Sequence, residues 1–176
     1  SLVGSEMCIR DSGYPIARVT AKVAVGLTLD EIMLANTPAS FEPTLDYVVT
    51  KVARFPFDKF SDASNKLGTQ MKATGEVMSI GRTMEESLLK AMRSLETGVC
   101  HIYHKKFDDW SDAQLLEYIK DATDDRLYAI AQLIRNGIDL VLIYDNTKID
   151  MFFLEKFKNI VEFEREVKAH PMDVET

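Results

Sequence analysis

Cysteine is scarce in this chain of 176 residues: only Cys8 and Cys100 are present, too few for a disulfide framework. We therefore expect a reducing, cytoplasmic setting. Basic residues are outnumbered, with 21 Lys and Arg against 28 Asp and Glu, and the formal net charge is -7. Nucleic-acid binding depends on clustered Lys and Arg, so the charge argues against a nucleic-acid partner. No apolar run approaches the roughly 18 residues of a membrane helix, so no membrane partner is expected.

The first twelve residues show neither helix nor strand periodicity, and they lack the charged-then-apolar layout of a signal peptide. We interpret residues 1–12 as a leader foreign to the fold, disordered or artefactual, and exclude them from the fold.

Residues 13–98 alternate between helix and strand patterns. Apolar residues at helical spacing predict a helix over residues 14–26, and Thr28-Leu29-Asp30-Glu31 is typical of a capping box that opens a short second helix. β-branched and aromatic residues predict a strand over about 47–54. Residues 69–72 and 76–80 are predicted to pair as a hairpin that turns at 73–75. Thr83-Met84-Glu85-Glu86 is a second capping box, opening a helix to Leu95.

Beyond Gly98 the pattern is helical throughout, and at least three helices are expected after Trp110. One begins near Ser111, one ends at Gly137, and the longest runs from Thr147 to about Lys168. The longest carries a wide apolar stripe that needs burial on two sides or a partner: Ile149, Phe152, Phe153, Phe157, Ile160 and Val161. The fold class is therefore α+β, followed by an all-α part. Charge changes at the same place, with ten basic and ten acidic residues over 13–98 but ten and sixteen over 99–176.

Three groups of residues have the types that a site needs. Cys100, His101 and His104 are possible zinc ligands, but a site needs three or four ligands, and His170 is the one further histidine. We favour a solvated loop for this group, and nothing fixes His104 as a base for Cys100. Phe55, Phe57 and Phe60 are interpreted as core rather than as a ligand platform. The acidic residues near expected helix starts are interpreted as capping and dipole contacts: Asp58, Asp108, Asp109, Asp124 and Asp125.

Gly75 and Gly81 lack the spacing of a phosphate loop, which favours a hairpin that runs into a helix. Lys51, Lys72 and Arg82 lie near the expected sheet, but lone cations bind phosphate weakly. No position is therefore predicted to be catalytic, cofactor-binding or metal-binding.

Several long motifs closely resemble the large chains of carbamoyl-phosphate synthases, in the same order along the sequence. They are Gly13-Tyr14-Pro15-Ile16-Ala17, Lys22 to Gly26, Ser40 to Lys51, Arg54-Phe55, Phe57 to Phe60, Thr69 to Thr83, Ser87 to Glu96 and Thr147 to Leu154. The resemblance covers about residues 13–172.

The resemblance implies an ATP-grasp enzyme that makes carbamoyl phosphate for arginine and pyrimidine synthesis. Its substrates are bicarbonate, glutamine-derived ammonia from a glutaminase small subunit, and two ATP with Mg²⁺ or Mn²⁺, with K⁺ a further candidate. Residues 13–98 would finish the first ATP-grasp unit, and residues 99–176 would begin the helical oligomerisation domain, through which copies assemble.

The family's Glu-x-Asn-x-Arg strand precedes the Gly13-Tyr14-Pro15 motif, and here the leader takes its place. Since that strand supplies metal and phosphate ligands, we expect this chain to be a structural fragment that binds no cofactor and is inactive alone. The alternative is a free-standing helical interaction module. The length of the open reading frame distinguishes the two.

Overall fold

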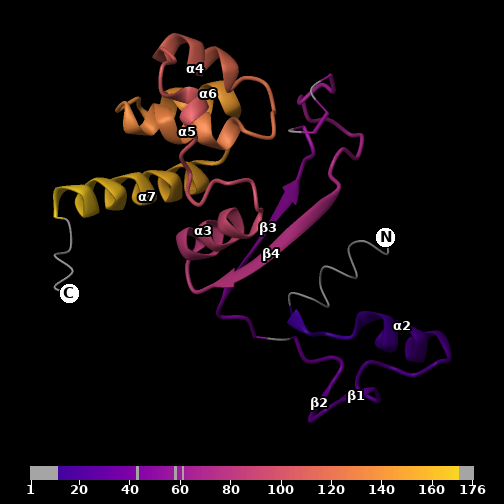
Figure 1. Ribbon diagram of the computed structural model, residues 1–176. Coiled ribbons are helices and arrows are strands. Elements are labelled where there is room, and N and C mark those ends of the chain that lie inside the picture. The colour runs from indigo at the N-terminus through magenta and orange to yellow at the C-terminus, as the bar shows by residue number, and fades with distance from the viewer. Residues whose placement is uncertain (1–11, 43, 58, 61, 171–176) are drawn as a thin grey trace, which may run out of the picture. The chain divides into compact units, whose positions relative to one another are not determined.

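The computed structural model describes all residues except 1–11, 43, 58, 61 and 171–176. The chain forms two compact units, residues 1–47 and 48–176, each described below by itself (Figure 1). The first combines one described helix, and the second several, with a two-stranded antiparallel sheet, so the fold is mixed α/β. None of the described helices is both long and apolar enough to cross a bilayer.

The first unit consists of helix α2 (Ile16–Ala24) and a short hairpin of β1 (Met33–Leu34) and β2 (Thr37–Pro38). The predicted helix over 14–26 is confirmed, and the chain leaves it at Gly26, whose φ of +102° suits glycine. A small core of Val19, Ile32 and Ala39 joins helix to hairpin, and the Tyr14 hydroxyl donates to the Ala39 carbonyl at 2.6 Å. Residues 1–12 were interpreted as a foreign leader, and of these only Ser12 is among the described residues.

The predicted second helix after Thr28 is wrong. The capping contact does form, because the Thr28 backbone N–H and hydroxyl both donate to the Glu31 carboxylate at 2.9 Å, but it closes a single turn. Pro38 disfavours a helical conformation at Thr37, so a helix opened at Thr28 could run no further than about residue 36. Ala35 instead takes a φ of +44°, and the chain turns into the β1–β2 hairpin.

The second unit begins with strands β3 (Val48–Arg54) and β4 (Gly75–Gly81), which pair antiparallel from Val48↔Gly81 to Arg54↔Gly75. The predicted strand over 47–54 is confirmed. The predicted pairing of residues 76–80 with residues 69–72 is wrong, because β4 pairs with β3 instead. Residues 69–72 are irregular, since Met71 is exposed and has no apolar neighbours to form a buried face. Lys72 Nζ donates to the carbonyls of Ser64 and Lys66, which closes the long β3–β4 loop on itself.

Helix α3 (Met84–Ser94) packs on the β3–β4 sheet and begins as the capping box predicts (Figure 1). The Thr83 hydroxyl accepts from the Glu86 N–H at 3.2 Å. Buried hydroxyls then join helix to sheet, because Ser87 Oγ donates to Thr50 Oγ1 at 2.7 Å and Ser79 Oγ donates to the Ser87 carbonyl at 2.5 Å. Gly81 permits this approach, since a Cβ there would lie 2.9 Å from the Ser87 backbone nitrogen.

Four α-helices follow Trp110 within the described residues, which confirms the expectation of at least three. They are α4 (Asp112–Tyr118), α5 (Arg126–Arg135), α6 (Leu140–Thr147) and α7 (Met151–Ala169), preceded by the 3-10 helix η1 (Lys105–Phe107). Ser111 and Gln114 form a complete capping box on α4. The longest helix starts at cap residue Asp150 rather than at Thr147, which ends α6.

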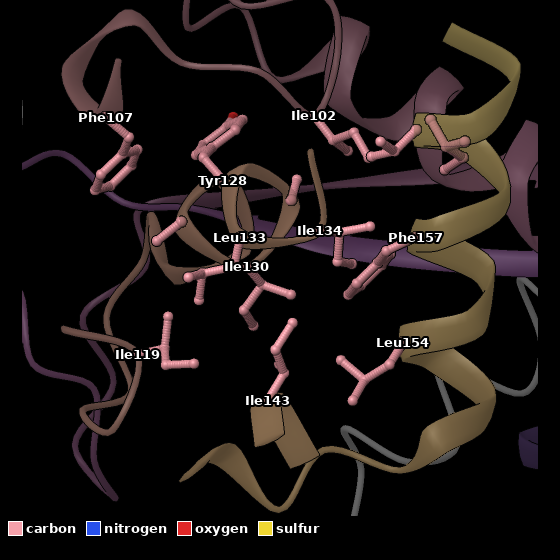
Figure 2. Close-up of a cluster of buried hydrophobic side chains, with 14 of the residues drawn as sticks. Ile102, Phe107, Ile119, Tyr128, Ile130, Leu133, Ile134, Ile143, Leu154 and Phe157 are labelled. Carbon is pink, nitrogen blue, oxygen red and sulfur yellow. The ribbon is translucent and has the colours of Figure 1, made fainter. Parts of the chain in front are cut away.

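One hydrophobic core serves the whole second unit (Figure 2). Side chains of α5, α6 and α7 point toward one another in it, including Leu133, Ile143 and Leu154, each fully buried. Leu88, Met92 and Leu95 of α3 belong to the same core. Each large side chain buried in this way stabilises the fold by roughly 1.5–3 kcal/mol. The expected domain boundary at residue 98 stays a prediction, and the hydrophobic core contains residues from both sides of that boundary.

Candidate association surface

Helix α7 leaves part of its apolar stripe uncovered. Phe152 is 52% exposed and Phe163 is 66% exposed, and Phe153 is exposed as well. Phe157 is only 8% exposed and packs in the core beside Leu154 (Figure 2). The prediction that several aromatic side chains of this helix are exposed is confirmed, and Phe157 is the exception. Large uncovered apolar areas on a protein surface mark interaction sites.

A groove runs between α3 and α7, and we call it the α3–α7 groove. It has a volume of about 500 Å³, and its apolar wall is formed by Leu89 of α3 with Ile160, Phe163 and Val167 of α7. A second hollow of about 340 Å³ adjoins it at Leu89, Ile160 and Phe163. The rim carries the polar side chains of Glu86, Arg93, Cys100, His101, Glu164 and Lys168.

Polar contacts join α3 to α7 at one end of the groove and α5 to α7 at the other. At one end the Glu85 carboxylate accepts from Asn159 Nδ2 at 2.9 Å and lies 3.4 Å from Lys156 Nζ. At the other end Glu164 accepts from Arg135 Nε at 3.0 Å and Nη2 at 2.9 Å, and Lys168 Nζ lies 2.5 Å away. Burial of Glu164 opposes its ionisation, but the hydrogen bonds from Arg135 and Lys168 outweigh burial and lower the pKa of its carboxyl.

Further apolar side chains are exposed on α6 and at the start of α7, and we call this set the α6–α7 junction. Val141, Leu142 and Tyr144 of α6 are exposed there, along with Phe152 at the start of α7. A lysine ammonium group lies over each of two of these exposed rings: Lys148 Nζ is 5.2 Å from the centre of Tyr144, and Lys156 Nζ is 5.4 Å from that of Phe152.

The cysteine and histidine group does not converge on one point. His101 Nδ1 accepts from the Ile102 N–H at 2.7 Å, while its Nε2 lies 3.3 Å from the Glu164 carboxylate. His104 Nδ1 instead accepts from the Lys106 N–H at 3.1 Å and so caps η1. Cys100 is an exposed thiol on the groove rim. Among the described residues, no three His, Cys, Asp or Glu side chains are placed to hold a metal ion.

The acidic residues are arranged differently from the capping interpretation. Asp125 occupies the N-cap position of α5 without a capping hydrogen bond, and it accepts from Lys106 Nζ and the Tyr118 hydroxyl at 2.5 Å each. Burial together with the charge of Asp125 raises the pKa of Asp124. Asp108 accepts from the Tyr103 hydroxyl at 2.6 Å. The capping part of the interpretation is therefore wrong for Asp108 and Asp125, while the dipole part stays a prediction, and Asp58 lies outside the described residues.

The lysines near the sheet have partners within the chain. Lys51 Nζ pairs with Glu76 at 2.7 Å, and Lys72 is bound to the two loop carbonyls described above. Phe55 and Phe57 stack with ring centres 5.7 Å apart, but both are only half-buried, and Phe60 is exposed. The interpretation of these three rings as core is wrong, because the β3–β4 loop that carries them lies at the surface.

The stability of the second unit is expected to fall as pH drops from about 7 to 5.5, because of His101. Burial of the ring lowers its pKa below the ordinary value of about 6.5. The positive charges of Arg135 and Lys168 lower the pKa further, and the negative charge of Glu164 raises it by less than the other effects lower it. The unfolded chain then binds the proton more readily, so the free energy of unfolding declines once pH falls through 6.5. The lowered pKa of the Glu164 carboxyl affects the free energy of unfolding only below about pH 4.5.

Urea unfolding at pH 7.0 and 5.5 measures this decline, and His101→Gln is expected to reduce it. The exposed His170 supplies a matched control, His170→Gln, which is expected to behave like the unsubstituted chain. An equal decline in the His101→Gln protein would assign the effect to another group.

A family model described as "Carbamoyl-phosphate synthetase large chain, oligomerisation domain" matches residues 76–176. The match includes nearly all of β4, the whole of α3 and every helix from α4 to α7. Both sides of the α3–α7 groove and the whole α6–α7 junction therefore lie inside the matched region. The sequence pattern indicated the α7 stripe but gave no sign of the part that α3 plays in the groove.

Proposed function

The chain belongs to the carbamoyl-phosphate synthetase large chain oligomerisation domain family, and we propose that it serves as a structural, non-catalytic part of a carbamoyl-phosphate synthase large chain. The observation that carries this proposal is the uncovered apolar surface of α7 within the matched region. A helix that exposes Phe152 and Phe163 while burying its other face is suited to hold a partner. The partner that we propose is a second copy of the chain.

Residues 13–98 form the end of the first ATP-grasp unit in this proposal, and residues 99–176 begin the oligomerisation domain. Support for the ATP-grasp part comes from the long motifs Ser40 to Lys51 and Thr69 to Thr83. The complete enzyme would join bicarbonate and ammonia at the expense of two ATP, with a glutaminase subunit supplying the ammonia.

The residues that the structure describes do not fit a Mg²⁺-ATP site. Lys51 already pairs with Glu76, and Lys72 already binds backbone carbonyls. The described carboxylates do not gather at metal spacing. Phosphoryl transfer depends on metal ions and cations placed around the phosphates, so this chain is proposed to support an enzyme whose chemistry takes place elsewhere.

Self-association of the purified chain is the expected result of sedimentation equilibrium across roughly 1 to 200 µM, the range of weak interfaces. The weight-average mass should rise with concentration toward a dimer or higher oligomer. Calorimetry with Mg²⁺-ATP on the same sample should give no binding heat, and no ADP should be released with bicarbonate. A constant monomer mass throughout that range would overturn the assembly role, and turnover above buffer would overturn the non-catalytic one.

A further inference from the structure

We propose that the second unit binds a small organic monocation, an ammonium ion with a short apolar body, in a pocket between β3, α3 and α5. We call it the β3–α5 pocket. Its volume is about 270 Å³, and it is lined by the end of β3, the C-terminal end of α3, the loop after α3 and the start of α5. The inference is independent of the proposed assembly function, because the pocket shares no lining residue with the α3–α7 groove.

The inner part of the β3–α5 pocket is apolar. Aliphatic and thioether side chains of three elements line it: Val52 of β3, Met92 and Leu95 of α3, and Leu127 of α5. The Tyr128 ring is 8% exposed and belongs to the core (Figure 2), and the centre of the His104 ring lies 5.4 Å from its centre. Aromatic faces attract cations as well as apolar groups. The volume is just below the roughly 300–1,000 Å³ of sites for drug-sized ligands, so a smaller molecule fits.

Two carboxylates, those of Asp124 and Asp125, line the pocket at the start of α5. Asp125 pairs with Lys106 Nζ at 2.5 Å, whereas Asp124 remains exposed, so an incoming ligand can reach it. Partial burial and the charge of Asp125 raise the pKa of the Asp124 carboxyl, and the charge of Lys106 lowers it by less. One lysine therefore serves two carboxylates, and an ammonium group beside Asp124 would offset the charge of Asp125.

A positive charge on another wall limits the ligand to one ammonium group. Arg54 lines the pocket at the end of β3, where its Nη1 donates to the Phe55 carbonyl. A ligand with ammonium groups at both ends would bring one of them toward this guanidinium, and such like-charge contacts are costly. A monocation can instead direct its charge to Asp124 and its apolar body to the inner wall.

Contacts of the β3–β4 loop hold the walls of the pocket together. The Leu67 N–H donates to the Ala122 carbonyl at 2.6 Å, and Lys66 Nζ pairs with Asp121 at 2.5 Å. These contacts join the loop that follows β3 to the residues that precede Asp124. The site is therefore largely formed before a ligand arrives, which lowers the ordering cost of binding.

NMR titration of the isotope-labelled chain with three probes of similar size tests the charge of the ligand. The cation 2-phenylethylammonium is expected to bind with a dissociation constant of roughly 0.1–1 mM, as its small size allows. The neutral 2-phenylethanol should bind at least about fivefold more weakly, and the anion 3-phenylpropionate more weakly still. The amide signals that shift should include those of Val99, His104 and Leu127, which belong to the pocket.

Variants test the role of Asp124. Asp124→Asn is expected to weaken binding of the cation at least about fivefold and to leave binding of the alcohol unchanged, because it removes only the charge. Asp145→Asn is the matched control, since it removes one exposed carboxylate outside the pocket, and it should change neither affinity. Thr97→Trp places a large ring at an exposed lining position and should reduce binding of both probes.

Three results would overturn the cation site. One is equal affinity for the cation and the alcohol, which would show an apolar hollow that does not recognise charge. Another is a set of shifted signals that lies outside the β3–α5 pocket. The third is the absence of any shift with the cation up to about 10 mM.

Discussion

Replacing Phe157 with aspartate is expected to unfold the second unit, whereas the same replacement at Phe152 leaves it folded. Phe157 is 8% exposed and touches the core formed by α5, α6 and α7 (Figure 2). Loss of a buried phenyl ring costs about 3–5 kcal/mol, and an isolated buried carboxylate adds several more. The sum approaches the whole stability of an ordinary domain, about 5–15 kcal/mol.

Far-UV circular dichroism and urea titration test this contrast. Phe157→Asp should lose most of the helical signal at neutral pH, while Phe152→Asp should keep both signal and midpoint. The sequence pattern placed both residues on one stripe of α7 and so did not distinguish them. The structure does, because the Phe157 ring is internal and the Phe152 ring is exposed. Full helicity in Phe157→Asp would contradict the packing described above.

Removal of the Glu164 carboxylate is expected to destabilise the second unit by about 3 kcal/mol. Glu164 and Arg135 are 12% and 13% exposed, so the pair is largely withdrawn from water. Alanine at residue 164 leaves the Arg135 guanidinium buried without its carboxylate, and Arg135 Nη1 already has no hydrogen-bond partner in the described structure. His101 and Lys168 lose the same anion.

The matched control is Glu162→Ala, two residues earlier on α7, where the carboxylate is exposed and lies 3.5 Å from Lys158. That pair should contribute less than about 1 kcal/mol. Urea unfolding of both variants gives the comparison, and replacing Arg135 by Met together with Glu164→Ala should recover part of the loss. Equal effects at residues 162 and 164 would show that the buried pair has no special role.

The helices could be predicted because their signals are local. Ser111 with Gln114, Thr83 with Glu86, and the stop at Gly137 each specify a helix end through neighbours in sequence. The β4 strand was also visible, but its partner was not. Strand pairing depends here on a segment 21 to 33 residues away, from Arg54↔Gly75 to Val48↔Gly81, and nothing in residues 69–72 or 48–54 says which of them β4 will join.

The association surface was predictable only in part, for a similar reason. A wide apolar stripe on α7 indicated that burial on two sides was needed, but periodicity does not say which members face the core. Phe157 and Phe163 look alike in sequence, and only the packing of α5 and α3 separates the buried ring from the exposed one. The groove needs Leu89 of α3, which lies some 70 residues from its neighbours on α7.

The core that spans residue 98 determines how this part of the protein can be exchanged between relatives. Leu88 and Met92 of α3 are buried in the same core as Ile143 and Leu154. An exchange that carried only the helices after Gly98 would mismatch the contacts that Leu88, Met92 and Leu95 make in that core, while one that began at Val48 would carry the sheet, α3 and their buried contacts together. Recombination during evolution is therefore expected to have been tolerated near residue 47 and selected against near residue 98, wherever the catalytic boundary lies.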